Sequence, residues 1–232
     1  MKRPDATDPR SIRYRLRKAR FALIERLIHE AARGAEPVRI LDIGGRRDYW
    51  RLLDPALRDR VEITIVNLAE EVAREEADDS FGIRFVTRVG DGRAMPEIAD
   101  GEYDLAHSNS VIEHVGLYAD MARFAAEHRR VARAYYMQTP NYWFPIEPHY
   151  GLPFFHWLSE PARLFLHTHV NPGFARRADW PEAMSRVDHT RMIPRRLVRV
   201  FFPDAVHATE RLALLPKSLI AWRGPDPGEG AP

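Results

Sequence analysis

The residues best suited to acid–base chemistry lie in a segment rich in prolines and aromatics. The run Asn141–Tyr150 places Glu147 and His149 on either side of Pro148. Because proline restricts the backbone, a side chain beside it has less conformational freedom to lose when it is positioned as a base. Glu147 and His149 are therefore candidate bases that could remove a proton from a substrate. A structural role for His149 in the loop is the alternative.

A second group of residues indicates a ligand pocket at the end of a buried strand. The run Val38–Gly45 is mostly apolar up to Asp42 and ends in Gly44 and Gly45. Glycine permits turns that a Cβ would forbid and lets the backbone approach a ligand closely. A strand, a glycine turn and a helix in that order are typical of nucleotide pockets in open α/β sheets. A plain turn with Asp42 as a cap is the alternative.

Polar residues also stand at the ends of the next three predicted strands. They are, in chain order, Asn67, Asp91, Ser108 and Asn109, with Gly92 directly after Asp91. Ligands of open α/β sheets bind beyond the carboxyl ends of the strands, so we expect these residues at one edge of the sheet. Turn formation is the alternative role for Asn67 and for the Asp91–Gly92 pair.

The elements that would hold these residues alternate regularly between strand and helix. Apolar and β-branched runs predict strands at 38–42, 61–66, 83–89, 103–108 and 134–138. Helical spacing of apolar residues, with Ser11 as a cap for the first helix, predicts helices at 11–33, 49–57, 70–77 and 117–132. This alternation predicts an α/β fold with a mostly parallel sheet and helices on both faces.

The last third of the chain departs from that rhythm. Residues 142–190 are dense in proline, histidine and aromatics, predict one helix at 153–167, and are expected to form a lid inserted between strands 5 and 6. A helix at 194–202 and strands at 205–212 and 217–223 follow, and the two strands should form an antiparallel hairpin at the sheet edge. We expect one domain over 11–223, with flexible termini at 1–10 and 224–232.

Four segments in this order resemble the class I S-adenosylmethionine-dependent methyltransferases, and within them the type 11 group. They are Leu41–Gly45, Val66–Leu68, Val89–Gly92 and Tyr103–Val115. The resemblance covers about residues 35–140 and implies a Rossmann-like sheet of seven strands that ends in the antiparallel hairpin. It also implies S-adenosylmethionine as the cofactor. The implied reaction is methyl transfer to an O or N acceptor of a small molecule, such as a metabolite, a glycan precursor or a lipid-linked intermediate.

The resemblance also implies roles for the residues at the strand ends. Gly44 and Gly45 would pass beneath the methionine part of the cofactor, and Asp42 would anchor its ammonium group directly or through water. Asn67 and Leu68, at the end of the second strand, would contact the ribose. Asp91 and Gly92, after the third strand, would contact the adenine amine. Ser108 and Asn109, at the end of the fourth strand, would contact the methionine moiety or the substrate. His114 would face the cofactor as a further candidate base, or would position its loop.

The chain departs from the family pattern in the glycine turn and after the second strand. Arg46 and Asp48 stand where further glycines are expected, and Asn67 stands where the family has an acid that binds both ribose hydroxyls. An amide can still bind hydroxyls, and Glu70 or Glu71 lies close enough in sequence to help. Arg46 could crowd the methionine end or pair with its carboxylate. An inactive relative that binds the cofactor is therefore one alternative function.

Composition and spacing argue against several other functions. The absence of cysteine excludes disulfides, thiolate zinc sites and a cysteine nucleophile. The histidines of the last third, including His156, His167 and His169, lack an i, i+4 pair, so we predict no metal site. A dinucleotide dehydrogenase is the weakest alternative, because the third glycine of the first turn is missing.

A cluster of basic residues near the N-terminus raises a nucleic-acid alternative. Six of them fall between Arg10 and Arg20, within a chain whose formal net charge is only +2. Such a helix could be the footprint of an RNA methyltransferase or an RNA-binding protein, or simply a solvated face. No secretion signal or membrane-spanning run is visible, so we expect a cytoplasmic protein.

Overall fold

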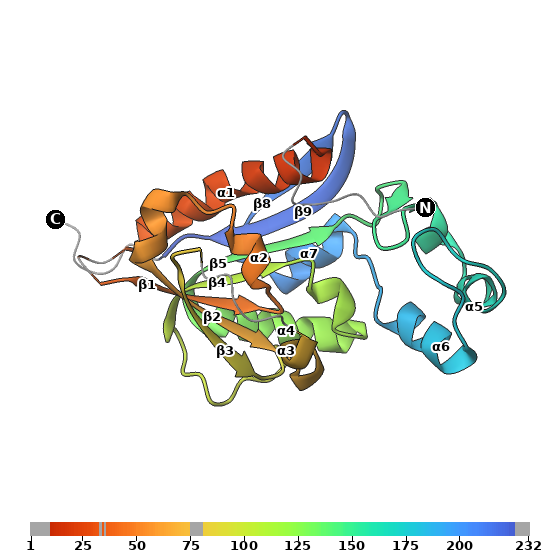
Figure 1. Cartoon of the computed structure of the whole chain (residues 1–232), viewed down its shortest axis with the longest axis horizontal. Coiled ribbons are helices and arrows are strands. Elements are labelled where there is room, and N and C mark those ends of the chain that lie inside the picture. Colours follow the sequence, from red (N-terminus) through yellow and green to blue (C-terminus); the bar gives the residue numbers. More distant parts are fainter. Residues whose placement is uncertain (1–9, 33, 35, 75–80, 226–232) are drawn as a thin grey trace.

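The computed structural model describes residues 10–32, 34, 36–74 and 81–225. Within these residues seven strands form one sheet in the order β3-β2-β1-β4-β5-β9-β8 (Figure 1). The first five strands are parallel, β9 pairs antiparallel with β5, and β8 pairs antiparallel with β9. Their bounds are β1 Val38–Ile43, β2 Val61–Asn67, β3 Arg84–Val89, β4 Tyr103–Asn109, β5 Ala132–Pro140, β8 Val206–Leu212 and β9 Leu215–Arg223. The predicted fold class is confirmed.

The central strands are apolar on both sides because helices cover both faces of the sheet. Along β5, Ala134 and Tyr136 belong to one buried cluster, whereas Tyr135 and Met137 belong to the other. Successive side chains of a strand point to opposite faces, so a strand buried on both faces reads as a nearly continuous apolar run. Helix α1 packs on one face of the sheet, and helices α4 and α7 pack on the other.

Four helices follow the sequence pattern. Helix α1 (Ile12–Ala31) begins after Ser11, whose side chain accepts a hydrogen bond from the backbone of Tyr14, as predicted. Helices α3 (Ala69–Arg74), α4 (Tyr118–Arg130) and α7 (Arg195–Phe201) also form. The end of the predicted helix at 70–77, and most of both termini, lie outside the described residues. None of the helices that the structure describes is long and apolar enough to cross a membrane.

The helix predicted at 49–57 is wrong. A short helix α2 (Arg47–Trp50) ends before a separate 3-10 helix η1 (Pro55–Arg60). Pro55 cannot continue a preceding helix, but it suits the first position of a new one. The side chain of Asp54 caps this new helix by accepting a hydrogen bond from the backbone of Ala56.

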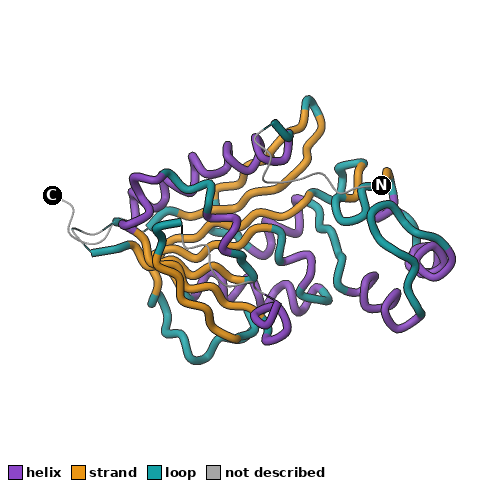
Figure 2. The backbone as a smooth tube through the Cα atoms, in the orientation of Figure 1, coloured by secondary structure: helices purple, strands orange, loops and turns teal. Residues whose placement is uncertain are grey.

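The segment between β5 and α7 extends past the sheet, beyond the end at which β5 finishes (Figures 1 and 2). It holds the two-stranded pair β6 (Ile146–Glu147) and β7 (Leu152–Pro153), a 3-10 helix η3 (Phe155–Trp157), and helices α5 (Glu160–His169) and α6 (Trp180–Asp188). The helix predicted at 153–167 starts later, because Ser159 caps it. Helix α6, which the sequence interpretation missed, begins after the cap Asp179.

His128 of α4 is an ionisable group buried between α4 and the face of the sheet that this helix covers. Its ring is fully buried beside Phe124, Tyr135 and Phe202, and neither of its nitrogens has a partner among the described residues. Burial lowers the pKa of His128 to about 3. At pH values below the ordinary histidine pKa, the ring takes up a proton only when the protein unfolds and exposes it. His128 therefore lowers the unfolding free energy as the pH falls from about 6.5 towards 3.

We expect His128→Leu to remove this component of the acid sensitivity. Between pH 7 and pH 5 the wild type should lose about 2 kcal/mol more unfolding free energy than the variant. Urea unfolding at the two pH values measures the difference, with His29→Leu, at an exposed position of α1, as the control. An equal loss in the wild type and in His128→Leu would contradict the prediction.

Candidate functional site

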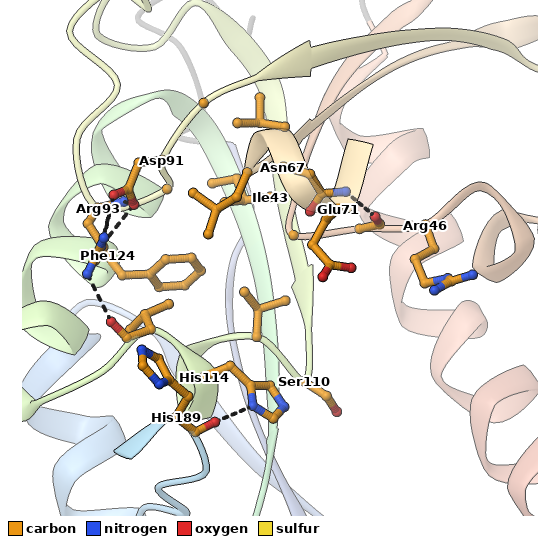
Figure 3. Close-up of a pocket in the computed structure, with 18 residues that line it drawn as sticks. Ile43, Arg46, Asn67, Glu71, Asp91, Arg93, Ser110, His114, Phe124 and His189 are labelled. Carbon is orange, nitrogen blue, oxygen red and sulfur yellow. Dashed lines mark hydrogen bonds and ion pairs between the residues drawn. The ribbon is translucent and has the colours of Figure 1, made fainter. Parts of the chain in front are cut away.

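A cavity of about 450 Å³ lies at the carboxyl ends of the first four parallel strands (Figure 3). Each strand end contributes to its wall, in the order Gly44 and Gly45, Asn67 and Leu68, Asp91 and Gly92, and then Ser110 and Val111. The crevice outside the carboxyl ends of the strands is the usual ligand position in an open α/β sheet. The structure therefore brings six of the predicted cofactor-binding residues, all but Asp42, Ser108 and Asn109, around one cavity.

The turn after β1 requires glycine at two successive positions. Gly44 has φ +71°, and a Cβ there would lie 2.6 Å from the side chain of Val111. A Cβ on Gly45 would lie 1.8 Å from the Asp42 carboxylate. One side of this turn therefore packs against Val111, which follows β4, and against the side chain of Asp42. The other side of the turn faces the cavity.

Asp42 lies beneath the glycine turn and not on the cavity wall. Its side chain is fully buried, with Oδ1 2.7 Å from Nδ1 of His107 and Oδ2 accepting from Nε1 of Trp50 at 2.7 Å. Both carboxylate oxygens are thus engaged inside the protein. The expected contact between Asp42 and a ligand's ammonium group has to be corrected to an indirect role, in which Asp42 positions the turn.

Arg46 does not fill the cavity, although it stands where the family pattern has glycine. Its side chain is 74% exposed, lies 3.4 Å from Asp48, and is directed away from Phe124 in Figure 3. The space beside the glycine turn therefore stays open. Arg46 lies at the cavity edge, where a guanidinium can still meet an anionic group.

Asn67 and Glu71 face the same part of the cavity. The amide nitrogen of Asn67 donates to the carbonyl of Gly45 at 2.8 Å, which leaves its carbonyl oxygen as the group that can accept from a hydroxyl. Glu71, from the first turn of α3, also lines the cavity, whereas Glu70 does not. A hydroxyl-bearing ligand would therefore meet an amide and a carboxylate here.

Asp91 is held by Arg93 two residues later. Arg93 donates from Nη2 to Oδ2 at 2.6 Å and from its backbone nitrogen to Oδ1 at 2.9 Å. Hydrogen bonds from Arg93, opposed by partial burial, lower the pKa of the Asp91 carboxyl. Asp91 is therefore an ionised acceptor on the cavity wall, and it is already oriented.

The fourth strand presents residues other than those expected. Ser108 is buried, and Oδ1 of Asn109 accepts from Arg20 at 2.8 Å, so neither side chain lines the cavity. Ser110 and Val111 line it instead, and Ser110 has φ +58°, an uncommon value for a residue with a Cβ. Because β4 ends at Asn109, the residues that face the cavity are the ones directly after the strand, and this position in the sequence could have identified Ser110.

The three candidate bases lie close together beside the cavity. His114 lines the cavity, and its Nδ1 donates to the carbonyl of His189 at 2.6 Å. The ring of His149 lies 4.7 Å from that of His114 and is paired through Nδ1 with the carboxylate of Glu147. Glu147 is buried and also accepts from the backbone of Tyr150. Of these residues His114 lines the cavity, His149 contacts the His114 ring, and Glu147 is hydrogen-bonded to His149.

The carboxylate of Glu113, the residue before His114 and itself a candidate base by sequence, joins these histidines in a grouping that the sequence did not predict. Glu113, His114 and His149 each offer one ligand atom, and these atoms lie within 4.8 Å of one another. Such a group could hold a metal ion. The spacing argument against a metal site considered the histidines of the last third, but the cluster combines residues 35 positions apart in the chain.

Apolar residues that the sequence interpretation did not assign complete the cavity wall. They are Ile43, Val66, Val115 and Phe124, and His189 joins them from the segment after α6. Apolar walls with a few oriented polar groups are typical of cofactor sites. Ile43 and Val66 lie at strand ends, and Phe124 reaches the cavity from α4.

Comparison with known proteins relates part of the chain to a known domain family. Residues 41–134 match the family model of the type 11 methyltransferase domain. Two uncharacterized proteins of Mycobacterium tuberculosis, MT1557 of strain CDC 1551 and Rv1509 of strain H37Rv, are each 33% identical over 75 residues, which is 32% of this chain and 26% of theirs. The chain thus spans about a quarter of the length of the curated relatives that it matches.

Solved structures share the fold at low sequence identity. The CurJ carbon methyltransferase has a TM-score of 0.53 at 10% identity, over 91% of this chain and 55% of its own. The methyltransferase domain of a bacterial Hen1 has a TM-score of 0.52 at 11% identity, over 89% and 98%. The PH0226 protein of Pyrococcus horikoshii OT3 has a TM-score of 0.50 at 16% identity, over 95% and 94%. These similarities concern the fold alone.

Substitution of Gly45 tests the packing of the turn on Asp42. We expect Gly45→Ala to lower the unfolding free energy by about 2–4 kcal/mol, because its Cβ would collide with a buried carboxylate that has no room to move. Urea unfolding measures the loss. Gly224→Ala is the control, because the atom nearest to its Cβ, at 3.2 Å, is the flexible end of Glu30. Equal stability of the two variants would contradict this description of the turn.

Proposed function

We propose that the chain is a class I methyltransferase that transfers a methyl group from S-adenosylmethionine to an O or N acceptor of a small molecule; the family match over residues 41–134 and the shared fold support this proposal. The observation that carries this proposal is the single cavity on which the glycine turn, Asn67 with Glu71, and Asp91 converge. Its volume lies within the range of ordinary small-molecule pockets.

The described residues fit the three parts of the cofactor. The backbone of Gly44 and Gly45 would pass beneath the methionine part, which a Cβ at these positions would not permit. The carbonyl of Asn67 and the carboxylate of Glu71 would accept the ribose hydroxyls. Asp91 would accept from the adenine amine. Through this fit, Asn67 and Glu71 together replace the missing acid of the second strand.

Methyl transfer requires alignment more than it requires a fixed set of reacting side chains. The bound cofactor supplies an electrophilic methyl group, and the acceptor must approach it in line. In our proposal His114 and His149 meet the acceptor, and one of them removes its proton where the acceptor is a hydroxyl or a protonated amine. Glu147 holds the His149 ring through Nδ1.

The segment 142–190 is proposed to cover the acceptor side of the site as a lid. It carries His149, and His189 near its end lines the cavity. Directly after the segment, the backbone nitrogen of Arg191 donates to the carbonyl of Glu113 at 2.8 Å. A glycan precursor, a lipid-linked intermediate or another metabolite would enter beneath it.

Nothing in the described structure favours the RNA alternative over a small acceptor. Arg20, the last residue of the basic cluster, is buried and pairs with Glu210 at 2.6 Å. Lys18 donates to the carbonyl of Leu52. Arg20 is therefore used inside the fold and does not extend a phosphate-binding face, whereas Lys18 is exposed.

Cofactor binding is the first experiment. Calorimetric titration of the full chain should give 1:1 binding of S-adenosylmethionine and of its demethylated product, and no binding of NAD. A screen of hydroxyl and amine acceptors for formation of the demethylated product then separates an active enzyme from an inactive relative. Absence of binding for both adenosyl compounds would contradict the proposal.

Asp91→Ala tests the adenine end of the site. Loss of a charged acceptor for the adenine amine should weaken binding of the demethylated product by roughly 1–3 kcal/mol, which is about 5-fold to 150-fold in the dissociation constant. Asp59→Ala, at an exposed position outside the cavity wall, is the matched control. Affinity that stays at the wild-type value in Asp91→Ala would restrict Asp91 to ordering its own turn with Arg93.

A further inference from the structure

We propose that Glu113, His114 and His149 form a binding site for one divalent transition-metal ion beside the cavity. The ion would bind an oxygen of the methyl acceptor. The site itself follows from the geometry of the cluster, whereas its role in methyl transfer rests on the proposed function. A metal ion in this role would restrict the proposed methyl acceptor, which could otherwise be an O or N compound, to a hydroxyl compound.

The first support is the position of the three ligand groups. One ligand atom from each residue lies within 4.8 Å of the other two. A tetrahedral ion with bonds of about 2.1 Å would separate its ligand atoms by roughly 3.4 Å. Side-chain rotations that bring the atoms together by about an ångström would therefore close the site, without a change in the fold.

The second support is a buried carboxylate oxygen that lacks a partner. Glu113 is fully buried, and its Oε2 accepts from the hydroxyl of Thr139 at 2.9 Å. Its Oε1 is buried and has no hydrogen-bond partner among the described residues. An unsatisfied buried carboxylate oxygen is costly, and a cation would satisfy it.

The third support is the way in which both imidazoles are held. The Nδ1 of His114 donates to the carbonyl of His189, and the Nδ1 of His149 is paired with the Glu147 carboxylate. A histidine that binds a metal through one nitrogen almost always donates from the other to such an oxygen, which fixes the ring and its tautomer. In the proposed site each ring would keep its proton on Nδ1 and bind the ion through Nε2.

The donor set selects the class of metal. Two imidazoles and one carboxylate suit zinc and its first-row neighbours, whereas magnesium and calcium prefer oxygen ligands alone. Three protein ligands also leave coordination positions open, as in catalytic sites. Because His114 lines the cavity, an open position could meet an acceptor that lies against the cofactor.

Methyl transfer to a hydroxyl bound at such an ion needs no further reagent. A hydroxyl of the acceptor bound to the ion loses its proton to water, because the ion lowers the pKa of a coordinated oxygen. The oxygen's electron pair forms the new bond to the methyl carbon. The bond from that carbon to sulfur breaks, and its pair stays on sulfur. The ion would thus replace a protein base for this step.

Cobalt binding tests the site without any turnover. The full chain, free of any histidine tag, is titrated with Co²⁺, and the visible d–d absorption is recorded, with Zn²⁺ as the competitor. We expect saturation at one Co²⁺ per chain and displacement by one Zn²⁺. His149→Ala should abolish the absorption, whereas His29→Ala, at an exposed position of α1, should retain it. Glu147→Gln should weaken binding about 10-fold to 100-fold, because it changes the group that orients His149.

The same samples separate this inference from the proposed function. Each variant is also titrated with the demethylated cofactor product, and its melting temperature shows whether it is folded. If the wild type binds the cofactor product but not Co²⁺, or if folded His149→Ala binds Co²⁺ like the wild type, the metal site is overturned and the proposed function stands. If Co²⁺ binds through these residues but the cofactor product does not bind, the metal site stands and the proposed function fails.

Discussion

The Asp42 carboxylate, buried beneath the Gly44–Gly45 turn, is the constraint on which the site depends. It accepts from Trp50 in α2 and pairs with His107 in β4, so one side chain joins three elements at the end of β1. A buried carboxylate that lost these partners would cost several kcal/mol. Its position also excludes a Cβ from Gly45, which keeps the turn thin where the cavity begins.

The surroundings of Asp42 explain why the cavity lies at this edge of the sheet. The ring of His107 is stacked on Tyr136 of β5 and touches Trp50, so the carboxylate and its partners form part of one buried aromatic cluster. That cluster fixes β1, β4 and β5 in register. The polar residues that follow these strands then meet at one edge of the sheet. Each is oriented by contacts within its own turn, as Asp91 is by Arg93.

The sequence predicted what local patterns determine and missed what distant contacts determine. The mostly parallel sheet follows from the alternation of strand and helix patterns, and Asp91 was placed at the site because it comes just after the third strand. Pro55 broke a predicted helix through a local rule that could have been applied. By contrast, the burial of Asp42 depends on Trp50 and His107, and the approach of His149 to Glu113 depends on how the segment after β5 folds back. No spacing within the sequence reports these contacts.

The proposed cofactor site is tested most directly by a crystal structure of the chain with S-adenosylhomocysteine, the demethylated product. We predict density for one molecule in the cavity, with its amino-acid end over the Gly44–Gly45 turn, its ribose near Asn67 and Glu71, and its adenine amine within hydrogen-bond distance of Asp91. Density at another place, or the opposite orientation with adenine over the glycine turn, would contradict this assignment.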